Sequence, residues 1–164
     1  MTAPTSVPPL ARLLALVVPA GAMATALVAQ YGFALAPCEM CWWQRYAHIA
    51  ALVAALLALV VRDARASRLL FWLAVAGIAA SGLIGGYHAG VEYHWWQGIT
   101  TCSTTRLSGG DALDAILSAP VIRCDVPAWT LFGISMAGYN FFGSLVAAAV
   151  IAGLARRGRQ GRQP

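Results

Sequence analysis

The chain has little charge for its length, few acidic residues and no lysine. Only 10% of its 164 residues are charged, whereas 60% are hydrophobic and the mean hydropathy is +0.69. An average soluble domain is about 25% charged, so this chain lacks the charge to coat a water-facing surface. The composition argues against both a disordered chain and an ordinary soluble domain. The length fits one compact unit, and a lipid bilayer is the natural solvent for so much apolar surface.

The scarcity of acidic residues leaves a net charge of +5, but its distribution argues against a nucleic-acid partner. All eleven basic residues are arginines, and seven of them stand in two short clusters, 62–68 and 156–162. Both clusters border long apolar runs, as arginines next to membrane spans do. Because no continuous basic face accompanies the charge, we expect no nucleic-acid binding.

Four apolar runs are long enough to cross a membrane. A helix needs about 20 mostly apolar residues to span the hydrocarbon core. The runs that qualify are 10–31, 42–61, 69–89 and 129–154. They are continuous rather than alternating, which favours helices over a β-barrel. The sequence therefore predicts an all-α protein, a single four-helix membrane domain over residues 1–164.

The arginines also predict the orientation of this bundle. Eight of them lie in the connection 62–68 or near the two termini, a side that has a single acidic residue. The positive-inside rule therefore places this side in the cytoplasm and the loops 32–41 and 90–128 outside. Within the long loop, residues 111–118 predict a short amphipathic helix, either on the membrane surface or packed on the bundle. Residues 12–24 also resemble a cleaved signal peptide, an alternative that would remove the first helix without moving the other loops across the membrane.

The chain has four cysteines, and all of them fall in the two outer loops: Cys38, Cys41, Cys102 and Cys124. An even number of cysteines on an oxidising face predicts disulfides. The layout implies the pairs Cys38–Cys41 and Cys102–Cys124, although four cysteines allow three connectivities. A C-x-x-C pair closes too small a ring to restrain the unfolded chain, and is a common redox device. The second pair could be a structural bond or an exposed disulfide for exchange. A zinc site is a lesser alternative.

A polar patch follows the C-x-x-C motif. The second helix is expected to begin near Cys41, where the helix dipole favours the thiolate. Arg45 lies one turn further on the same face, His48 continues that face, and Gln44 flanks it. Arg45 could instead be an interfacial charge whose head reaches toward water, and His48 could be a packing residue. We favour a functional role for Arg45 because a thiol stands next to it.

Small and polar residues in the third and fourth spans predict close helix packing. Gly82, Gly86 and Gly90 recur every four residues, a spacing that lets two helices approach closely. Asn140 lies inside the fourth span, where a buried amide is costly unless it is hydrogen-bonded. We expect Asn140 to bond to a neighbouring helix; a ligand contact is the alternative.

Together these motifs resemble one known family. The matching segments are 37–41 (Pro-Cys-Glu-Met-Cys), 44–45 (Gln-Arg), 90–92 (Gly-Val-Glu), 124–129 (Cys-Asp-Val-Pro-Ala-Trp) and 131–133 (Leu-Phe-Gly). They resemble the disulfide bond formation protein B (DsbB) family, the quinone-dependent thiol oxidases of the bacterial inner membrane. The resemblance covers nearly the whole chain.

The resemblance implies a route for electrons. A reduced periplasmic partner with a thioredoxin fold, similar to DsbA, attacks the Cys102–Cys124 disulfide, and Cys102 forms the mixed disulfide with it. The Cys38–Cys41 disulfide then reoxidises the loop pair. DsbA is a strong oxidant with a reduction potential of about −120 mV, so its own acceptor must be a stronger oxidant still, and a quinone pool can be one.

The resemblance also implies the cofactor. Electrons leave Cys41, as thiolate, for a bound ubiquinone or menaquinone, with Arg45 beside it. Gln44 and His48, the other members of the polar patch, are further candidates for quinone contact, and we expect no metal.

Two other classes of protein remain open. A vitamin K epoxide reductase-like enzyme also couples C-x-x-C to a quinone, but there the motif usually follows the loop cysteines, whereas here it precedes them. A membrane scaffold with two structural disulfides would leave Arg45 beside Cys41 as a coincidence. His88 and His94 do not fall cleanly on a histidine that the DsbB family has near the end of the third span, so no quinone role is assigned to either.

Overall fold

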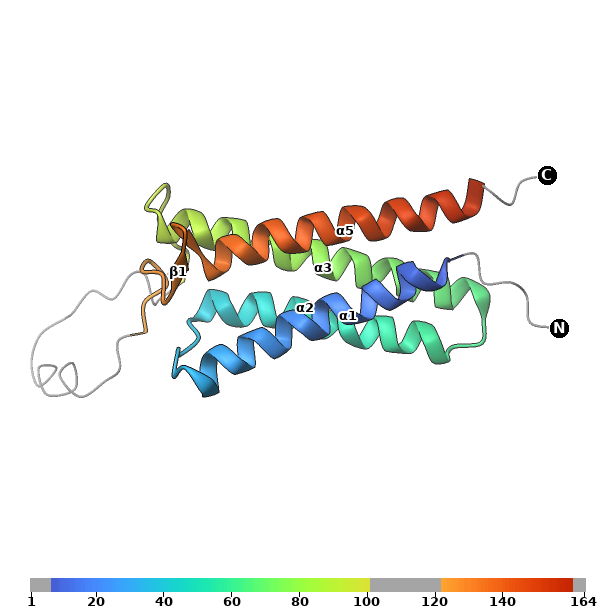
Figure 1. Cartoon of the computed structure of the whole chain (residues 1–164), viewed down its shortest axis with the longest axis horizontal. Coiled ribbons are helices and arrows are strands. Elements are labelled where there is room, and N and C mark those ends of the chain that lie inside the picture. Colours follow the sequence, from blue (N-terminus) through green and yellow to red (C-terminus); the bar gives the residue numbers. More distant parts are fainter. Residues whose placement is uncertain (1–6, 101–121, 161–164) are drawn as a thin grey trace, which may run out of the picture.

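Four long helices make up most of the computed structural model, which describes residues 7–100 and 122–160 (Figure 1). In chain order they are α1 (Pro9–Leu27), which a π-helical turn η1 (Val28–Gly32) continues, α2 (Glu39–Val60), α3 (Ala64–Glu92) and α5 (Met136–Gln160). All four are long and apolar enough to cross a membrane. The all-α prediction is therefore confirmed, and the chain is a multi-pass membrane protein. Cys102 and the predicted helix 111–118 lie outside the described residues.

The connection between α2 and α3 is shorter than the predicted loop 62–68. Asp63 caps α3, because its carboxylate accepts a 2.8 Å hydrogen bond from the backbone N–H of Ala66, and the helix begins at Ala64. Arg65 and Arg68 therefore belong to the first turns of α3, whereas Arg62 precedes the cap. Hydropathy placed the start of the helix too late, because it follows apolar side chains and does not see a polar first turn.

The fourth helix also begins later than the predicted span 129–154. A small antiparallel hairpin, β1 (Thr130–Leu131) paired with β2 (Ile134–Ser135), comes first, and α5 starts at Met136. Gly133, at the tip of the hairpin, has a φ of 76°, a conformation that glycine adopts without strain. The segment is apolar enough to extend a span on hydropathy alone, but its left-handed turn cannot continue a helix.

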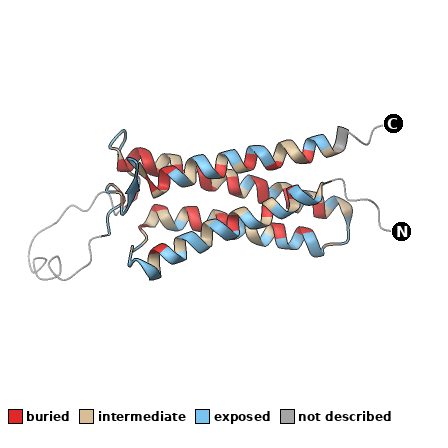
Figure 2. Ribbon diagram, viewed as in Figure 1, coloured by how far each residue is buried: buried red, intermediate tan, exposed pale blue. Residues whose placement is uncertain are grey.

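Small residues bring the helices close together. Alanines dominate the buried core: Ala11, Ala15, Ala51, Ala55, Ala58, Ala74, Ala148 and Ala155. The close packing predicted for the glycines is confirmed for two of them. A Cβ on Gly82 would lie 3.1 Å from the Cβ of Ser144, and one on Gly86 only 2.6 Å from the ring of Phe141. Figure 2 shows buried positions along all the long helices. Many of the exposed positions carry large apolar side chains, as lipid contact requires.

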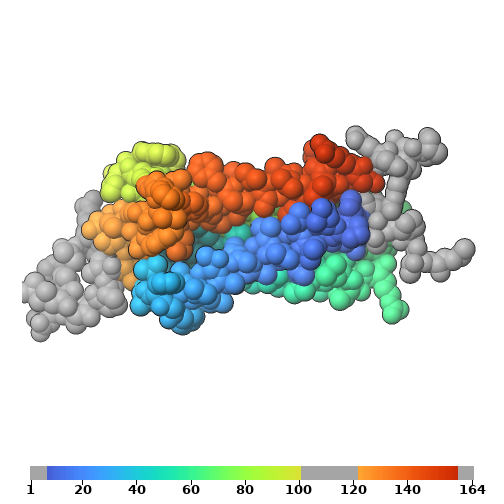
Figure 3. Space-filling model, viewed as in Figure 1, coloured from blue at the N-terminus to red at the C-terminus, as the bar shows by residue number. Residues whose placement is uncertain are grey.

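The bundle has two different ends. At one end lie the start of α1, the end of α5 and the turn between α2 and α3 (Figures 1 and 3). At the other end lie the turn 33–38, the hairpin and the end of α3. Because α3 runs on to Glu92, the predicted outer loop 90–128 begins at Tyr93 instead. The cysteines described below gather at this second end.

Candidate functional site

Two thiols lie at the start of α2, where the sequence placed them. Cys38 is the N-cap of the helix, and its sulfur accepts a 3.4 Å hydrogen bond from the backbone N–H of Cys41. The two Sγ atoms are 3.1 Å apart, and both thiols are free. The hydrogen bond to Cys41 and then burial raise the pKa of the Cys38 thiol. Cys38 therefore keeps its proton and donates it toward Cys41, which is the better placed of the two to carry negative charge.

A third thiol joins this pair from far along the chain. Cys124 is fully buried and packs with Cys38, Met40 and Val91 in one small apolar cluster. The expected partner of Cys124, Cys102, lies outside the described residues, so the predicted pairing stays a prediction. The sequence did not reveal that Cys124 would lie against the C-x-x-C motif, because the two stand in different loops.

The surroundings of Cys124 favour its thiolate. Burial raises the pKa of the Cys124 thiol, but hydrogen bonds with the Thr100 hydroxyl, the Met40 backbone, the Cys38 thiol and the Glu39 backbone outweigh it, and the net pKa is lowered. The Thr100 hydroxyl lies 3.5 Å from the sulfur. The two backbone donors belong to the first turn of α2, so the same helix N-terminus serves Cys124 as well as the motif cysteines.

His88, to which the sequence assigned no role, lies directly against these thiols. Its Nε2 is 3.5 Å from the Cys38 sulfur and 3.7 Å from Oε1 of Glu92, and only 2% of its surface is exposed. The second carboxylate oxygen of Glu92 is buried without a hydrogen-bond partner in the described part of the chain. The signal in the sequence was the spacing of His88 and Glu92, which puts both side chains on one face of α3.

Three of these side chains could also hold a metal ion. The ligand atoms of Cys38, Cys41 and His88 all lie within 4.8 Å of one another. Two thiolates and an imidazole are a donor set that zinc accepts, with a fourth position left open. A metal and a Cys38–Cys41 disulfide exclude each other, since the disulfide removes both thiolates.

Gln44 connects His88 to Asn140, in the interior of the bundle. The side-chain N–H₂ of Gln44 donates to the backbone carbonyl of Met40 at 3.2 Å and lies 3.0 Å from Nδ1 of His88. The side-chain oxygen of Gln44 accepts a 2.8 Å hydrogen bond from Nδ2 of Asn140. Gln44 is thus bonded to both α3 and α5.

Asn140 continues this chain of hydrogen bonds deeper into the bundle. Its Nδ2 donates to the backbone carbonyl of Ser81 at 3.1 Å. Its Oδ1 accepts a 2.8 Å bond from the Ser144 hydroxyl and lies 3.0 Å from Nε2 of His48. The predicted bonding of Asn140 to neighbouring helices is confirmed.

Arg45 is held by α1 and by an aromatic ring. One guanidinium nitrogen donates to the side-chain oxygen of Gln30 and the other to the carbonyl of Ala26 at 3.2 Å. The guanidinium carbon lies 5.1 Å from the centre of the Trp42 ring. Gln30 belongs to η1, and π-helical turns often mark functional sites. Both hydrogen-bonded oxygens are neutral, so these bonds position Arg45 without cancelling its charge.

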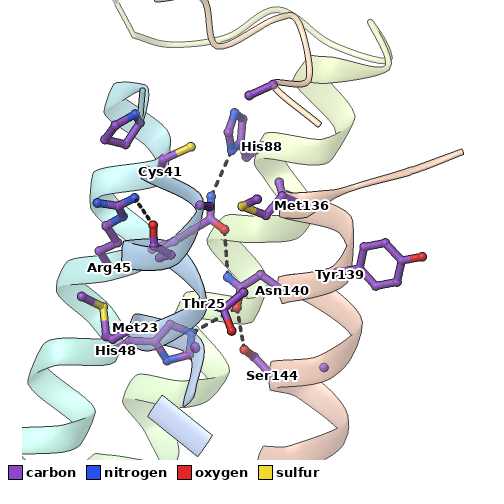
Figure 4. Close-up of a pocket in the computed structure, with 18 of the residues that line it drawn as sticks. Met23, Thr25, Cys41, Arg45, His48, His88, Met136, Tyr139, Asn140 and Ser144 are labelled. Carbon is purple, nitrogen blue, oxygen red and sulfur yellow. Dashed lines mark hydrogen bonds between the residues drawn. The ribbon is translucent and has the colours of Figure 1, made fainter. Parts of the chain in front are cut away.

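A cavity of about 510 Å³ unites these side chains. The predicted site residues that line it are Cys38, Cys41, Gln44, Arg45 and His48, and His88, Glu92 and Asn140 line it as well. Figure 4 shows Cys41 and His88 at one end and His48 and Ser144 at the other. The side of the cavity formed by α1 is lined mostly by small residues, among them Gly21, Ala22 and Ala26. His94 is not among the lining residues; it lies in the turn after α3.

The thiols of this membrane bundle gather at a helix N-terminus, beside an internal cavity. These features place the chain in the class of membrane thiol proteins. The sequence model of the family "Disulfide bond formation protein DsbB" matches residues 8–154, so the chain belongs to this family, whose members are thiol oxidoreductases of disulfide bond formation. A curated relative, "Uncharacterized protein RP370" of Rickettsia prowazekii (strain Madrid E), is 32% identical over 124 residues, which are 73% of this chain and 71% of that protein. No solved structure matches.

Proposed function

We propose that this protein reoxidises a periplasmic DsbA-like dithiol and passes the electrons to the quinone pool of the bacterial inner membrane. The observation that carries the proposal is the placement of Cys124 against Cys38, at one end of a cavity that Cys41 and Arg45 line. Both termini then face the cytoplasm, and the redox loops face the periplasm. Membership of the family supports this assignment over the vitamin K epoxide reductase-like enzyme and the structural scaffold.

The thiol chemistry balances over the four cysteines. The partner's two thiols become a disulfide while the Cys102–Cys124 disulfide is reduced to two thiols. The Cys124 thiolate then attacks Cys38, which breaks the Cys38–Cys41 bond and releases Cys41 as a thiolate. Attack of Cys102 on Cys124 restores the loop disulfide and leaves the motif pair reduced. Two electrons and two protons have then moved from the partner to Cys38 and Cys41.

The packing of Cys124 against Cys38 supports this order of exchange. The attacking sulfur must reach the target sulfur, and these two side chains already share a buried cluster. The lowered pKa of Cys124 keeps more of this thiol in the attacking form, whereas the raised pKa of Cys38 makes it a poor nucleophile in its reduced state.

The cavity fits a quinone ring. Its volume of about 510 Å³ and its mostly small, apolar lining suit a flat apolar ligand that enters from the bilayer. Arg45 supplies fixed donors near Cys41, and Nδ1 of His48 is a buried polar atom with no protein partner in the described part of the chain. A bound ubiquinone or menaquinone would supply a two-electron, two-proton acceptor there.

The protein's own groups then hold the charges. Arg45, one turn from Cys41 on α2, favours negative charge on that sulfur and on an oxygen placed between them. Gln44 donates to Nδ1 of His88, so the proton of the neutral His88 ring sits on Nε2 and points toward Cys38 and Glu92. His88 therefore stabilises negative charge on the sulfurs as a hydrogen-bond donor.

Disulfide trapping tests the exchange step. In a variant that keeps only Cys38 and Cys124, a mild oxidant such as diamide should form an intramolecular disulfide rapidly, because the two side chains are already packed together. The matched control moves the second thiol two residues away, with Cys124→Ala and Ile122→Cys, and should form the bond much more slowly.

Quinone reduction tests the overall reaction. The purified protein with a reduced DsbA-like partner should consume ubiquinone-1, followed by its absorbance, and Cys124→Ala should abolish this turnover. Full quinone reduction by Cys124→Ala would show that electrons bypass the loop pair and would overturn the proposal.

A further inference from the structure

Two backbone carbonyls fix the orientation of the buried amides. The N–H₂ of Gln44 must face the carbonyl of Met40, and the N–H₂ of Asn140 must face the carbonyl of Ser81, because a carbonyl oxygen can only accept. The oxygen of Gln44 then faces the second hydrogen of Asn140, as the 2.8 Å contact requires. Rotating either amide by half a turn would set two acceptors against each other.

This orientation determines where the proton of His48 sits. The side-chain oxygen of Asn140 is an acceptor, and it lies 3.0 Å from Nε2 of His48. Nε2 therefore carries the proton in the neutral ring, which leaves Nδ1 as a lone-pair acceptor. Only 3% of His48 is exposed, its Nδ1 has no partner in the described part of the chain, and the residue lines the cavity. A buried acceptor of this kind is costly unless a ligand or water satisfies it.

We propose that Nδ1 of His48 accepts a hydrogen bond from a hydroxyl group of the reduced quinone, so that the inner end of the cavity prefers quinol to quinone. The inference rests on the proposed function and adds a residue that tells the two redox forms of the ligand apart. A quinol hydroxyl carries a hydrogen that Nδ1 can accept, whereas a quinone carbonyl offers only lone pairs, which the lone pair of Nδ1 repels.

The arrangement of the cavity supports this division of roles. His48 follows Cys41 by seven residues on α2, a rise of about 10 Å, and Arg45 lies between them. The Cys41 end therefore presents a thiol and a guanidinium donor, and the His48 end presents an acceptor (Figure 4). Tighter binding of the quinol makes the bound quinone a stronger oxidant: a tenfold preference raises the potential of a two-electron couple by about 30 mV. A protein that must oxidise a strongly oxidising dithiol benefits from such a shift.

The decisive measurement compares binding of the two redox forms. The full chain, carrying Cys41→Ser to prevent turnover, is titrated in nanodiscs with ubiquinol-1 and with ubiquinone-1 under anaerobic conditions. We expect ubiquinol-1 to bind roughly three- to tenfold more tightly, the value of one hydrogen bond, and His48→Phe to remove the preference. Ser144→Ala is the matched control. It removes another hydrogen bond to Asn140 but leaves Nδ1 of His48 as it is, and should retain the preference.

A spectroscopic readout keeps the test independent of the folding of His48→Phe. In ¹⁵N-histidine-labelled protein, the His48 ring should be neutral with its proton on Nε2, and its Nδ1 resonance should shift with ubiquinol-1 but not with ubiquinone-1. Equal affinities for the two forms, or a His48 proton on Nδ1, would overturn this inference while leaving the proposed function standing. Failure of both probes to bind would overturn the two together.

Discussion

Arg45 shows how a buried cation can be positioned and still remain available. Its two hydrogen bonds go to neutral oxygens of α1 and η1, and its guanidinium lies near the Trp42 ring, so the side chain is held in place while its charge is kept. In a thinly hydrated layer a charge interacts more strongly than in water. Arg45 therefore lines the cavity one turn along α2 from Cys41, with a positive charge that these two bonds leave in place.

Substitutions of Arg45 should separate quinone chemistry from thiol exchange. Lysine keeps the charge but loses the planar fork, so quinone turnover should fall from the native protein to Arg45→Lys and further to Arg45→Met. Losing one charged hydrogen bond in this setting costs about 1.5–3 kcal/mol, which is roughly ten- to a hundredfold in rate. Steady-state quinone reduction measures this effect, and single-turnover oxidation of the DsbA-like partner without added quinone should change little.

Gln30→Leu is the control that separates the effect of the position of Arg45 from the effect of its charge. It removes one hydrogen-bond partner of Arg45 but leaves the cation, so its turnover should lie between those of the native protein and Arg45→Met. Equal slowing of both steps by Arg45→Met would make Arg45 a folding residue. If Arg45→Met slows neither step, Arg45 is an interfacial charge without a role in the reaction.

At the scale of the elements, local patterns were readable from the sequence and long-range contacts were not. Hydropathy located all four helices, and the C-x-x-C motif marked the start of α2. The arrival of Cys124 at that helix start, and of His88 from α3, depends on how separate segments pack. The hairpin before α5 was missed because its residues are as apolar as those of a span.

Gly85, at the contact of α3 and α5, lets these helices approach closely enough for the hydrogen bond between Gln44 and Asn140. A Cβ on Gly85 would lie 2.9 Å from the carbonyl of Ala137, 3.1 Å from Nδ2 of Asn140 and 3.2 Å from the side-chain oxygen of Gln44. Gly85→Ala should therefore push α5 away and destabilise the protein by about 1–3 kcal/mol. Thermal unfolding in detergent measures this loss.

Gly153→Ala is the matched control on α5, because a Cβ there has nothing within 4 Å. It should be neutral or raise stability by up to about 1 kcal/mol, since alanine is the better helix former. If both variants unfold at the same temperature as the native protein, the helices have room to separate and the close contact is not needed for stability.

The whole molecule places its thiol cluster at one end and most of the arginines of its described part at the other. The start of α2, the hairpin and the end of α3 lie together, opposite the α2–α3 turn, the start of α1 and the end of α5 (Figure 1). Cys38 and Cys124 pack together at the first of these two ends. Such polarity suits an enzyme that must meet a partner on one side of a membrane only. By the positive-inside rule, the arginines concentrated at the far end predict that this end faces the cytoplasm.

Single cysteines at the two ends should therefore label from opposite sides of the membrane. In a background with all native cysteines replaced by alanine, Ile99→Cys places a thiol at a site that is 72% exposed at the redox end. Arg65→Cys places one at an exposed site near the start of α3 and leaves most of the basic cluster intact. A membrane-impermeant maleimide should label Ile99→Cys in intact spheroplasts and Arg65→Cys only after the membrane is permeabilised. The reverse pattern would put the thiols in the reducing cytoplasm, where a disulfide-generating reaction with a periplasmic partner is impossible, and would overturn the orientation and the proposed function together.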